Sequence, residues 1–204
     1  DGLRLGESLG GRQALDLAAP GAWCPVSRVT WPDGSGGVFP HIIDRGKPGV
    51  IGVLADGARF CNEGLGYHDY VREMLAAVPP EAECASWRGE DPDFQRGTTP
   101  YMRLQGDASV RPNPCLAPIE TGPFYAVKVI PGSFGVFAGL RTDGAARVLD
   151  AERRPIPGLY AAGADMASVM GGHYPAGGIN LGPALTFGFL AGRHAAGPSQ
   201  ERPA

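Results

Sequence analysis

The segment "MGGHYPAGGINLGPALTFGFLAGRHAAG", residues 170–197, decides the fold because it joins a glycine-rich loop to a long apolar run. Five of the twelve residues from Gly171 to Gly182 are glycine, and no charge follows until Arg193. Glycine is favoured where φ is positive or where another group approaches the backbone too closely for a Cβ atom. The loop is therefore predicted to be a contact surface. A turn before a buried helix is the simpler interpretation.

A helix is predicted directly after this loop. Pro183 suits the first helical position, and Leu185, Leu190 and Ala191 fall on neighbouring turns of a helix that runs to Ala195. The unpaired N–H groups and the dipole at a helix start favour a negative group or an electron-rich carbonyl. The loop and the helix start together therefore indicate a binding site.

The composition is that of a loop-rich globular protein. The 204 residues are 43% hydrophobic, and the 32 Gly and 20 Pro are spread between apolar runs. A net charge of −3 with dispersed Lys and Arg gives no basic surface, so nucleic acid is not an expected partner. The charged first residues do not resemble a signal peptide, and no apolar window reaches the length of a membrane span. We expect a soluble, cytoplasmic protein.

The cysteines give no sign of a metal or redox site. Cys24, Cys61, Cys84 and Cys115 lie far apart without a C-x-x-C pair or clustered His. No metal is predicted, and buried thiols of a reducing compartment are the favoured interpretation.

The remaining pattern alternates short helices with hairpins. Helices are expected from Leu3 to Gly10 and from Asp69 to Val78, closed by Pro79-Pro80. The expected β-structure is a hairpin over 50–61 with an Asp56-Gly57 turn, a strand over 122–132, a second hairpin turning at 142–144, and a buried strand over 158–162.

The order of the last strand, loop and helix resembles the C-terminal end of FAD-dependent flavoproteins of the fumarate reductase and succinate dehydrogenase superfamily. The 3-ketosteroid Δ1-dehydrogenase-like branch is the most similar. Its motifs are matched at Pro123–Lys128, Ala138–Asp143, Ile156–Gly163 and Tyr174–Gly178. The similarity reaches back to residues 1–8 and 58–70 and so covers most of the chain.

The resemblance implies a mixed fold, α+β or α/β, made of the C-terminal part of an FAD-binding domain plus a substrate-capping domain. The implied domains are an FAD-domain segment over 1–19, the cap over 20–115, the FAD-binding C-terminal part over 116–197 and a disordered tail over 198–204. The G-x-G-x-x-G turn that binds the FAD pyrophosphate is missing, since "GSGGVF" at 34–39 lacks the third glycine and no helix follows. The chain is expected to be part of a longer enzyme, and an N-terminal FAD-binding half on another chain is an expected partner.

The resemblance also assigns catalytic roles. Δ1-type dehydrogenation needs a carbonyl polariser, a base and a flavin. Tyr174 O–H and the Gly178 backbone N–H would bind the ketone oxygen, and Tyr67 would be the base. Because a free phenol has a pKa of about 10, Tyr67 needs a neighbour, for which His68 is a candidate. The simpler interpretations are a packed loop aromatic for Tyr174 and a domain-interface residue for Tyr67.

The implied cofactor is FAD. Ile179, Asn180 and Leu181 precede the helix and would meet the flavin pyrimidine edge, while Gly163 ends the strand beside it. The resemblance also implies that Ala164, Asp165 and Gly177 bind the cofactor. Ala164 stands where relatives often have Glu or Asn, with Asp165 displaced by one, which is a departure from the family pattern.

Other polar residues are interpreted as structural. His173 is expected to support Tyr174 by a hydrogen bond, Arg59 and Glu63 to form an ion pair, and His41 and Asp44 to form a salt bridge in a turn.

Three functions stay open. The first is dehydrogenation of an apolar cyclic ketone, steroid-type ketones included, with an unidentified electron acceptor. The second is fumarate or dicarboxylate reduction. It is disfavoured because Tyr67 stands where fumarate reductases carry the Arg that serves as proton donor, and because "FGVFAG" at 134–139 lacks their His. The third is a folded but inactive chain that binds a partner.

Overall fold

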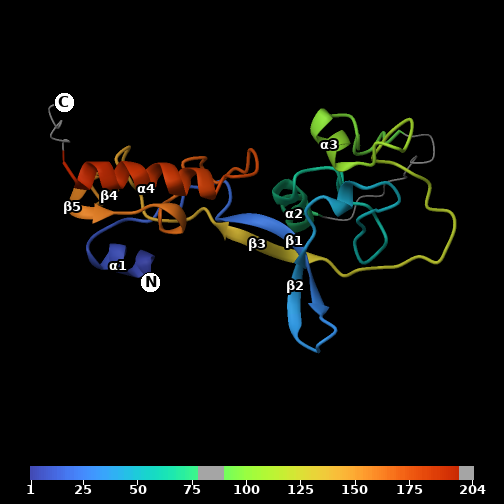
Figure 1. Cartoon of the computed structure of the whole chain (residues 1–204), viewed down its shortest axis with the longest axis horizontal. Coiled ribbons are helices and arrows are strands. Elements are labelled where there is room, and N and C mark those ends of the chain that lie inside the picture. The colour runs from blue at the N-terminus through green and yellow to red at the C-terminus, as the bar shows by residue number, and fades with distance from the viewer. Residues whose placement is uncertain (78–89, 198–204) are drawn as a thin grey trace, which may run out of the picture. The chain divides into compact units, whose positions relative to one another are not determined.

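The computed structural model describes residues 1–77 and 90–197 (Figure 1). Pro79, Pro80, Cys84 and the expected tail over 198–204 lie outside these residues. The chain divides into a terminal unit, Asp1–Ala22 with Phe134–Ala204, and a central unit, Trp23–Ser133. The boundaries between the units lie at 22/23 and 133/134, whereas the expected domain limits lie at 19/20 and 115/116. The roles of the units as FAD domain and substrate cap stay predictions.

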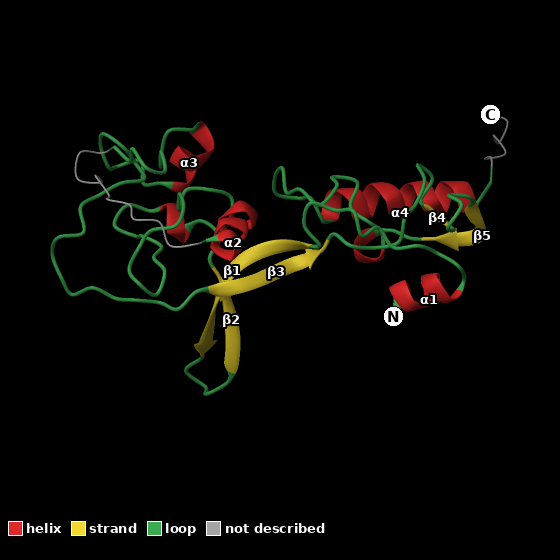
Figure 2. Cartoon of the chain, turned by 180° about the vertical axis from the view of Figure 1, so that it is seen from behind, coloured by secondary structure: helices red, strands yellow, loops and turns green. Residues whose placement is uncertain are grey.

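A three-stranded sheet has the order β2-β1-β3 (Figure 2). Strands β1 (Gly21–Thr30) and β2 (Gly36–Pro40) form an antiparallel hairpin whose register runs from Val26↔Pro40 to Thr30↔Gly36. The turn between them suits its sequence, because the Asp33 carboxylate accepts from the Ser35 N–H at 2.9 Å and Gly34 has a φ of +83°. Strand β3 (Ile130–Val136) lies on the other side of β1.

The central unit also holds two short helices and a 3-10 turn. These are η1 (Asp44–Gly46), α2 (Tyr67–Ala76) and α3 (Pro100–Gln105). Helix α3 begins at Pro100 because the Thr99 hydroxyl caps the Met102 N–H at 3.3 Å and proline needs no N–H partner there. Helix α2 begins two residues before the expected start at Asp69. The expected hairpin over 50–61 has its turn, with Gly57 at a φ of +87°, but only one bridge, Val53↔Arg59.

The terminal unit begins and ends with helices. Helix α1 (Gly2–Ser8) ends before Gly10, at a φ of +94°, as the Gly-Gly pair predicts. Strands β4 (Arg147–Leu149) and β5 (Pro155–Tyr160) pair antiparallel, η3 (Gly163–Asp165) follows, and α4 (Leu181–Ala195) closes the unit. The main core contains Leu140, Val148, Ala161 and Met166, with Phe187 of α4 packed against it.

Three sequence expectations are corrected. Residues 122–129 form no strand, and Phe124, Tyr125 and Val127 are exposed, because apolar β-type residues do not reveal whether a pairing partner exists. Strand β5 is only half-buried in the described chain. Helix α4 starts at Leu181 rather than Pro183, since any residue of the first turn can lack an N–H partner.

Within residues 1–77 and 90–197, the helices are all too short or too polar to cross a bilayer.

Candidate functional site

The glycine loop of the terminal unit uses its glycines in two ways. At Gly172, with a φ of +85°, a Cβ atom would lie 2.6 Å from the Ala19 nitrogen, so the close neighbour is the chain's own backbone. At Gly178, with a φ of +90°, no atom of the described chain lies within 4 Å of the Cβ position. The loop is therefore packed at its start and open before α4.

The opening continues into a cavity of about 250 Å³. Five of the seven residues expected to bind the cofactor line it, namely Gly163, Ala164, Ile179, Asn180 and Leu181. The walls are completed by residues 134–137, 166–169 and 183–184. A second cavity of about 440 Å³ is lined by Gly177 and Gly178 and shares Ile179 and Pro183 with the first. The structure thus gathers six of the seven expected cofactor residues around two adjoining spaces.

The start of α4 offers backbone donors to these spaces. The Gly182 N–H donates to the Gly178 carbonyl at 2.7 Å and the Ala184 N–H donates to the Asn180 carbonyl at 3.2 Å. Among residues 1–77 and 90–197, no backbone acceptor is seen for the N–H groups of Asn180 and Leu181. Helix-start N–H groups of this kind suit a carbonyl or an anion.

Tyr174 lies next to the cavities without lining either. Its half-buried ring packs with Ala22, Phe137 and Ile179, and its centroid is 6.1 Å from that of Phe137. Since Ile179 lines both cavities, this apolar cluster fixes one wall of the site. The neighbouring His173 has an exposed side chain, and its role in supporting Tyr174 stays a prediction.

Asp165 is not brought to the cavity. It is exposed, its carbonyl accepts from the Leu140 N–H at 2.8 Å, and a side chain on Gly2 of α1 would collide with its carboxylate. The described geometry therefore places Asp165 beside α1, while Ala164 lines the cavity.

Tyr67 belongs to the central unit, whereas Tyr174 and Gly178 belong to the terminal unit. It is the first residue of α2 and is half-buried. The next residue, His68, is buried, and its Nδ1 accepts from the Trp23 N–H at 3.1 Å. That ring nitrogen is therefore committed to the backbone and does not serve Tyr67.

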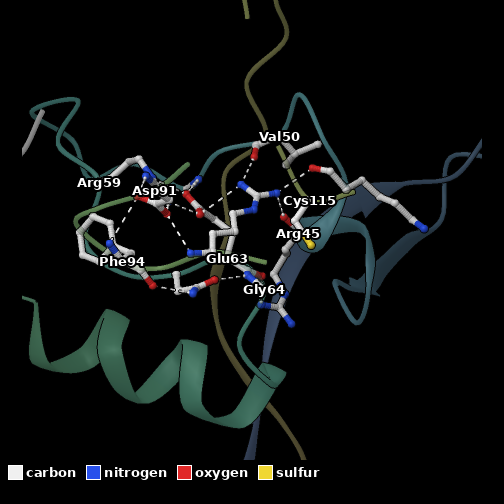
Figure 3. Close-up of polar contacts among 12 residues, drawn as sticks. Arg45, Val50, Arg59, Glu63, Gly64, Asp91, Phe94 and Cys115 are labelled. Atoms are coloured by element: carbon white, nitrogen blue, oxygen red, sulfur yellow. Dashed lines mark hydrogen bonds and ion pairs between the residues drawn. The ribbon is translucent and has the colours of Figure 1, made fainter. Parts of the chain in front are cut away.

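A buried ion network joins the segment before α2 to residues 91 and 96, which follow it (Figure 3). Arg59 pairs with Glu63 at 2.6 Å and with Asp91 at 3.0 Å, and Arg96 pairs with Glu63 at 3.1 Å; the four side chains are at most 6% exposed. The Arg59–Glu63 pair confirms the prediction. Sequence reasoning missed Asp91 and Arg96, because both fall in a polar stretch that has the composition of a surface loop.

The network changes the titration of its members. Burial alone would raise the pKa of Asp91, but hydrogen bonds from Arg59 and from the Phe94 and Arg96 N–H groups hold it below its ordinary value. Burial lowers the pKa of Arg96. The guanidinium groups of Arg59 and Arg96 share the two carboxylates, and Arg96 also donates to the backbone carbonyls of Arg45, Lys47 and Val50.

His41 and Asp44 form the expected salt bridge, with Nδ1 2.5 Å from Oδ2. The His41 Nε2 lies 2.8 Å from the Ser27 Oγ, which gives the side-chain order of a hydrolytic triad. However, the Ser27 hydroxyl donates its only proton to the Lys128 carbonyl at 2.7 Å. Ser27 therefore has no proton to give to His41, and the arrangement is structural.

Within the described residues, the thiols and acidic side chains form no metal centre. Cys24, Cys61 and Cys115 are buried and free, and burial raises the pKa of Cys24 to about 11. No group of three metal-ligating side chains occurs in the part of the chain that the structure describes.

Comparison with known proteins relates this geometry to flavoproteins. A family model described as an FAD binding domain matches residues 1–181. A 4-oxocyclohex-2-ene-1-carboxylate 5-dehydrogenase of Sinomonas cyclohexanicum is 34% identical over 251 residues, covering 92% of this chain and 42% of the relative. A 4-oxocyclohexanecarboxylate 2-dehydrogenase of the same organism is 50% identical over 126 residues, covering 61% of this chain and 22% of the relative.

A crystal structure of 3-ketosteroid delta1-dehydrogenase from Sterolibacterium denitrificans, in complex with 1,4-androstadiene-3,17-dione, matches with a TM-score of 0.83 and 30% identity. The match covers 95% of this chain and 46% of that chain. The chain thus spans less than half the length of each of these relatives. It belongs to the FAD-binding domain family, in the 3-ketosteroid Δ1-dehydrogenase-like branch of the fumarate reductase superfamily, and the family's cofactor is FAD.

Proposed function

We propose that this chain is the C-terminal portion of an FAD-dependent dehydrogenase that introduces a C=C bond beside the ketone of a cyclic substrate. The observation that carries the proposal is the cavity at the start of α4, lined by Gly163, Ala164, Asn180 and Leu181. The relatives support the reaction class, because they are named as dehydrogenases of 4-oxocyclohexane-type carboxylates and of a 3-ketosteroid.

The residues around the cavity fit a flavin edge. The N–H groups of Asn180 and Leu181 point from a helix start, where a pyrimidine carbonyl is stabilised by the dipole. Gly163 has a φ of +65°, and its Cβ position would lie 3.5 Å from the Ala184 side chain, so a larger residue there would meet α4. FAD, when bound, supplies the acceptor for the hydride that leaves the substrate carbon.

Gly178 and Tyr174 are proposed to bind the ketone oxygen. The Gly178 N–H has no hydrogen-bond partner within residues 1–77 and 90–197, and open space lies beside this residue. A preorganised N–H that faces open space can stabilise an enolate oxygen without reorganising. The Tyr174 hydroxyl would add a second donor to the same oxygen.

Tyr67 is proposed to take the proton from the carbon beside the ketone. Its phenolate oxygen would accept the proton while the ketone oxygen gains negative charge at Tyr174 and Gly178. The tyrosine at this position favours the ketone reaction over fumarate reduction, where the family resemblance implies an arginine acid.

The pyrophosphate of FAD is proposed to be held by a separate dinucleotide-binding half. These 204 residues contain no G-x-G-x-x-G turn. The chain matches 42% of the length of the 4-oxocyclohex-2-ene-1-carboxylate dehydrogenase and 46% of the length of the ketosteroid dehydrogenase.

Turnover assays test the proposal. FAD-loaded protein is mixed with an artificial electron acceptor and either a 3-ketosteroid or 4-oxocyclohexanecarboxylate, and the product is examined by mass spectrometry. We expect acceptor reduction and a product lighter by two hydrogens with at least one ring ketone. Reduction of fumarate by the reduced protein, without ketone turnover, would favour the dicarboxylate function instead. Flavin-loaded protein that is inert with both ketones would contradict the proposal.

A further inference from the structure

Arg45 is a buried arginine whose guanidinium contacts no carboxylate of residues 1–77 and 90–197 within hydrogen-bond distance. All five of its N–H donors go to backbone carbonyls. Nε donates to His41 at 3.0 Å, and Nη2 donates to Ile42 at 2.9 Å. Nη1 donates to Glu63 at 3.1 Å, and both terminal nitrogens donate to Leu65 at 3.3 Å. Burial lowers the pKa of this group, so its position is held against a desolvation cost.

Two of the four carbonyls that Arg45 binds, those of Glu63 and Leu65, belong to the loop immediately before α2. Residues 62–66 form no strand or helix, so their carbonyls need partners from side chains. Arg45 binds the carbonyls of Glu63 and Leu65, and the Gln105 amide donates to the carbonyl between them, that of Gly64, at 3.2 Å. Three consecutive carbonyls are therefore fixed by two buried side chains.

The same guanidinium also touches α2 itself. Its central carbon lies 4.6 Å from the centroid of the Tyr70 ring, in the first turn of the helix. Arg45 thus holds both the loop that leads into α2 and the first turn that carries Tyr67. Because the carbonyls before α2 are bound, the direction in which the backbone runs into the helix is fixed. Tyr67 is the first residue of that helix.

We propose that Arg45 is the positioning residue for Tyr67. The inference rests on the proposed function, in which Tyr67 accepts the substrate proton, and it adds a group that acts through the backbone and not on the substrate. A lysine at this position keeps the charge but has three donors on a flexible stem, and it cannot bind four carbonyls in one plane.

The first readout is structural and independent of activity. The full chain is labelled with 3-fluorotyrosine, and the fluorine NMR signal of residue 67 is assigned with Tyr67→Phe. We expect Arg45→Lys to shift and broaden that signal. Arg96→Lys is the matched control, because Arg96 is equally buried and binds the Glu63 carboxylate and the carbonyls of Arg45, Lys47 and Val50, but it binds no backbone carbonyl of residues 63–65. We expect it to lower the denaturant midpoint while leaving the signal in place.

The second readout is turnover. In FAD-loaded protein, Arg45→Lys is expected to lower kcat roughly 100-fold with little change in KM, because a misplacement of about 1 Å can cost that much. A fluorine signal that stays unchanged in Arg45→Lys, or that moves equally in Arg96→Lys, overturns the inference whatever the turnover. If the signal moves only in Arg45→Lys while kcat is unchanged, Arg45 does position Tyr67, and it is the catalytic role of Tyr67 that fails.

Discussion

The loop before α2 and the loop before α4 both lead into a helix, but they are built in opposite ways. In the central unit, the carbonyls of residues 63–65 are bound by buried side chains, and Glu63 is fixed by two arginines. In the terminal unit, the loop has open space beside Gly178. Leu185 and Phe189 on the following helix are 74% and 64% exposed. The first loop has its backbone held by buried side chains. The second has open space beside its backbone, where we propose that the flavin and the ketone bind.

The largest effect is expected from the residue that the fixed loop presents. Tyr67→Phe removes the proposed base and should lower kcat by about 10²–10⁴-fold, while the unfolding midpoint should change little because the residue is only half-buried. Steady-state kinetics and denaturant unfolding check both parts. Tyr101→Phe, at an exposed tyrosine of the same unit, is the control. Equal activity of the two variants would show that Tyr67 is not the base.

Breaking the buried network should cost stability. Glu63→Gln removes the carboxylate that Arg59 and Arg96 share, and breaking a buried ion pair from one side typically costs about 3–5 kcal/mol. Urea unfolding of the variant measures this cost. The control is Glu152→Gln, which removes an exposed ion pair with Arg154 and should change the free energy of unfolding by less than about 1 kcal/mol. Similar losses for both would mean that the central unit is not held by its buried charges.

Acid should weaken the central unit through Asp91. Its pKa is lowered in the folded chain, so the unfolded chain binds more protons near pH 4. The stability it contributes is present above about pH 4 and is lost as the pH falls through the lowered folded-state pKa. Unfolding free energies over a series of acid pH values should fall steeply in the wild type and less steeply in Asp91→Asn. Parallel curves would show that Asp91 does not carry this dependence.

The open loop should be less sensitive than the fixed one. Gly178→Ala places a side chain at a φ of +90° and should cost about 1–2 kcal/mol of stability. Gly177→Ala is the matched control, because its φ is not positive and its Cβ position is equally open. Thermal unfolding of both variants makes the comparison. If the two substitutions cost the same, the left-handed backbone at Gly178 is not the reason for glycine there.

The sequence predicts local features of both loops and misses the long-range ones. The Gly10-Gly11 helix end, the Gly57 turn and the Arg59–Glu63 pair follow from local spacing, because the interacting residues are close in sequence. The Arg45 contacts with residues 63–65 and the Arg59–Asp91 pair join segments about 20 and 32 residues apart. Composition does not indicate such pairs, and a polar stretch around Asp91 has the same pattern whether it is buried or solvated.

The strand expected over 122–132 illustrates the opposite error. Its apolar residues indicate a strand, but Phe124 and Tyr125 are exposed, and only the part from Ile130 onward pairs in the sheet. For the cofactor site, the motif order predicted which residues gather at the start of α4. It could not reveal that Asp165 turns toward α1, because that contact depends on packing between the two ends of the chain.

The most direct test of the central claim, that the start of α4 receives the flavin, is a titration of the chain with FAD followed by flavin fluorescence. We predict saturable binding that Ala164→Phe weakens by about tenfold, or roughly 1.4 kcal/mol, because the new ring fills the cavity. Ala151→Phe, at an exposed turn of the same unit, should bind like the wild type. Saturable binding with equal affinity for the two variants would contradict the account.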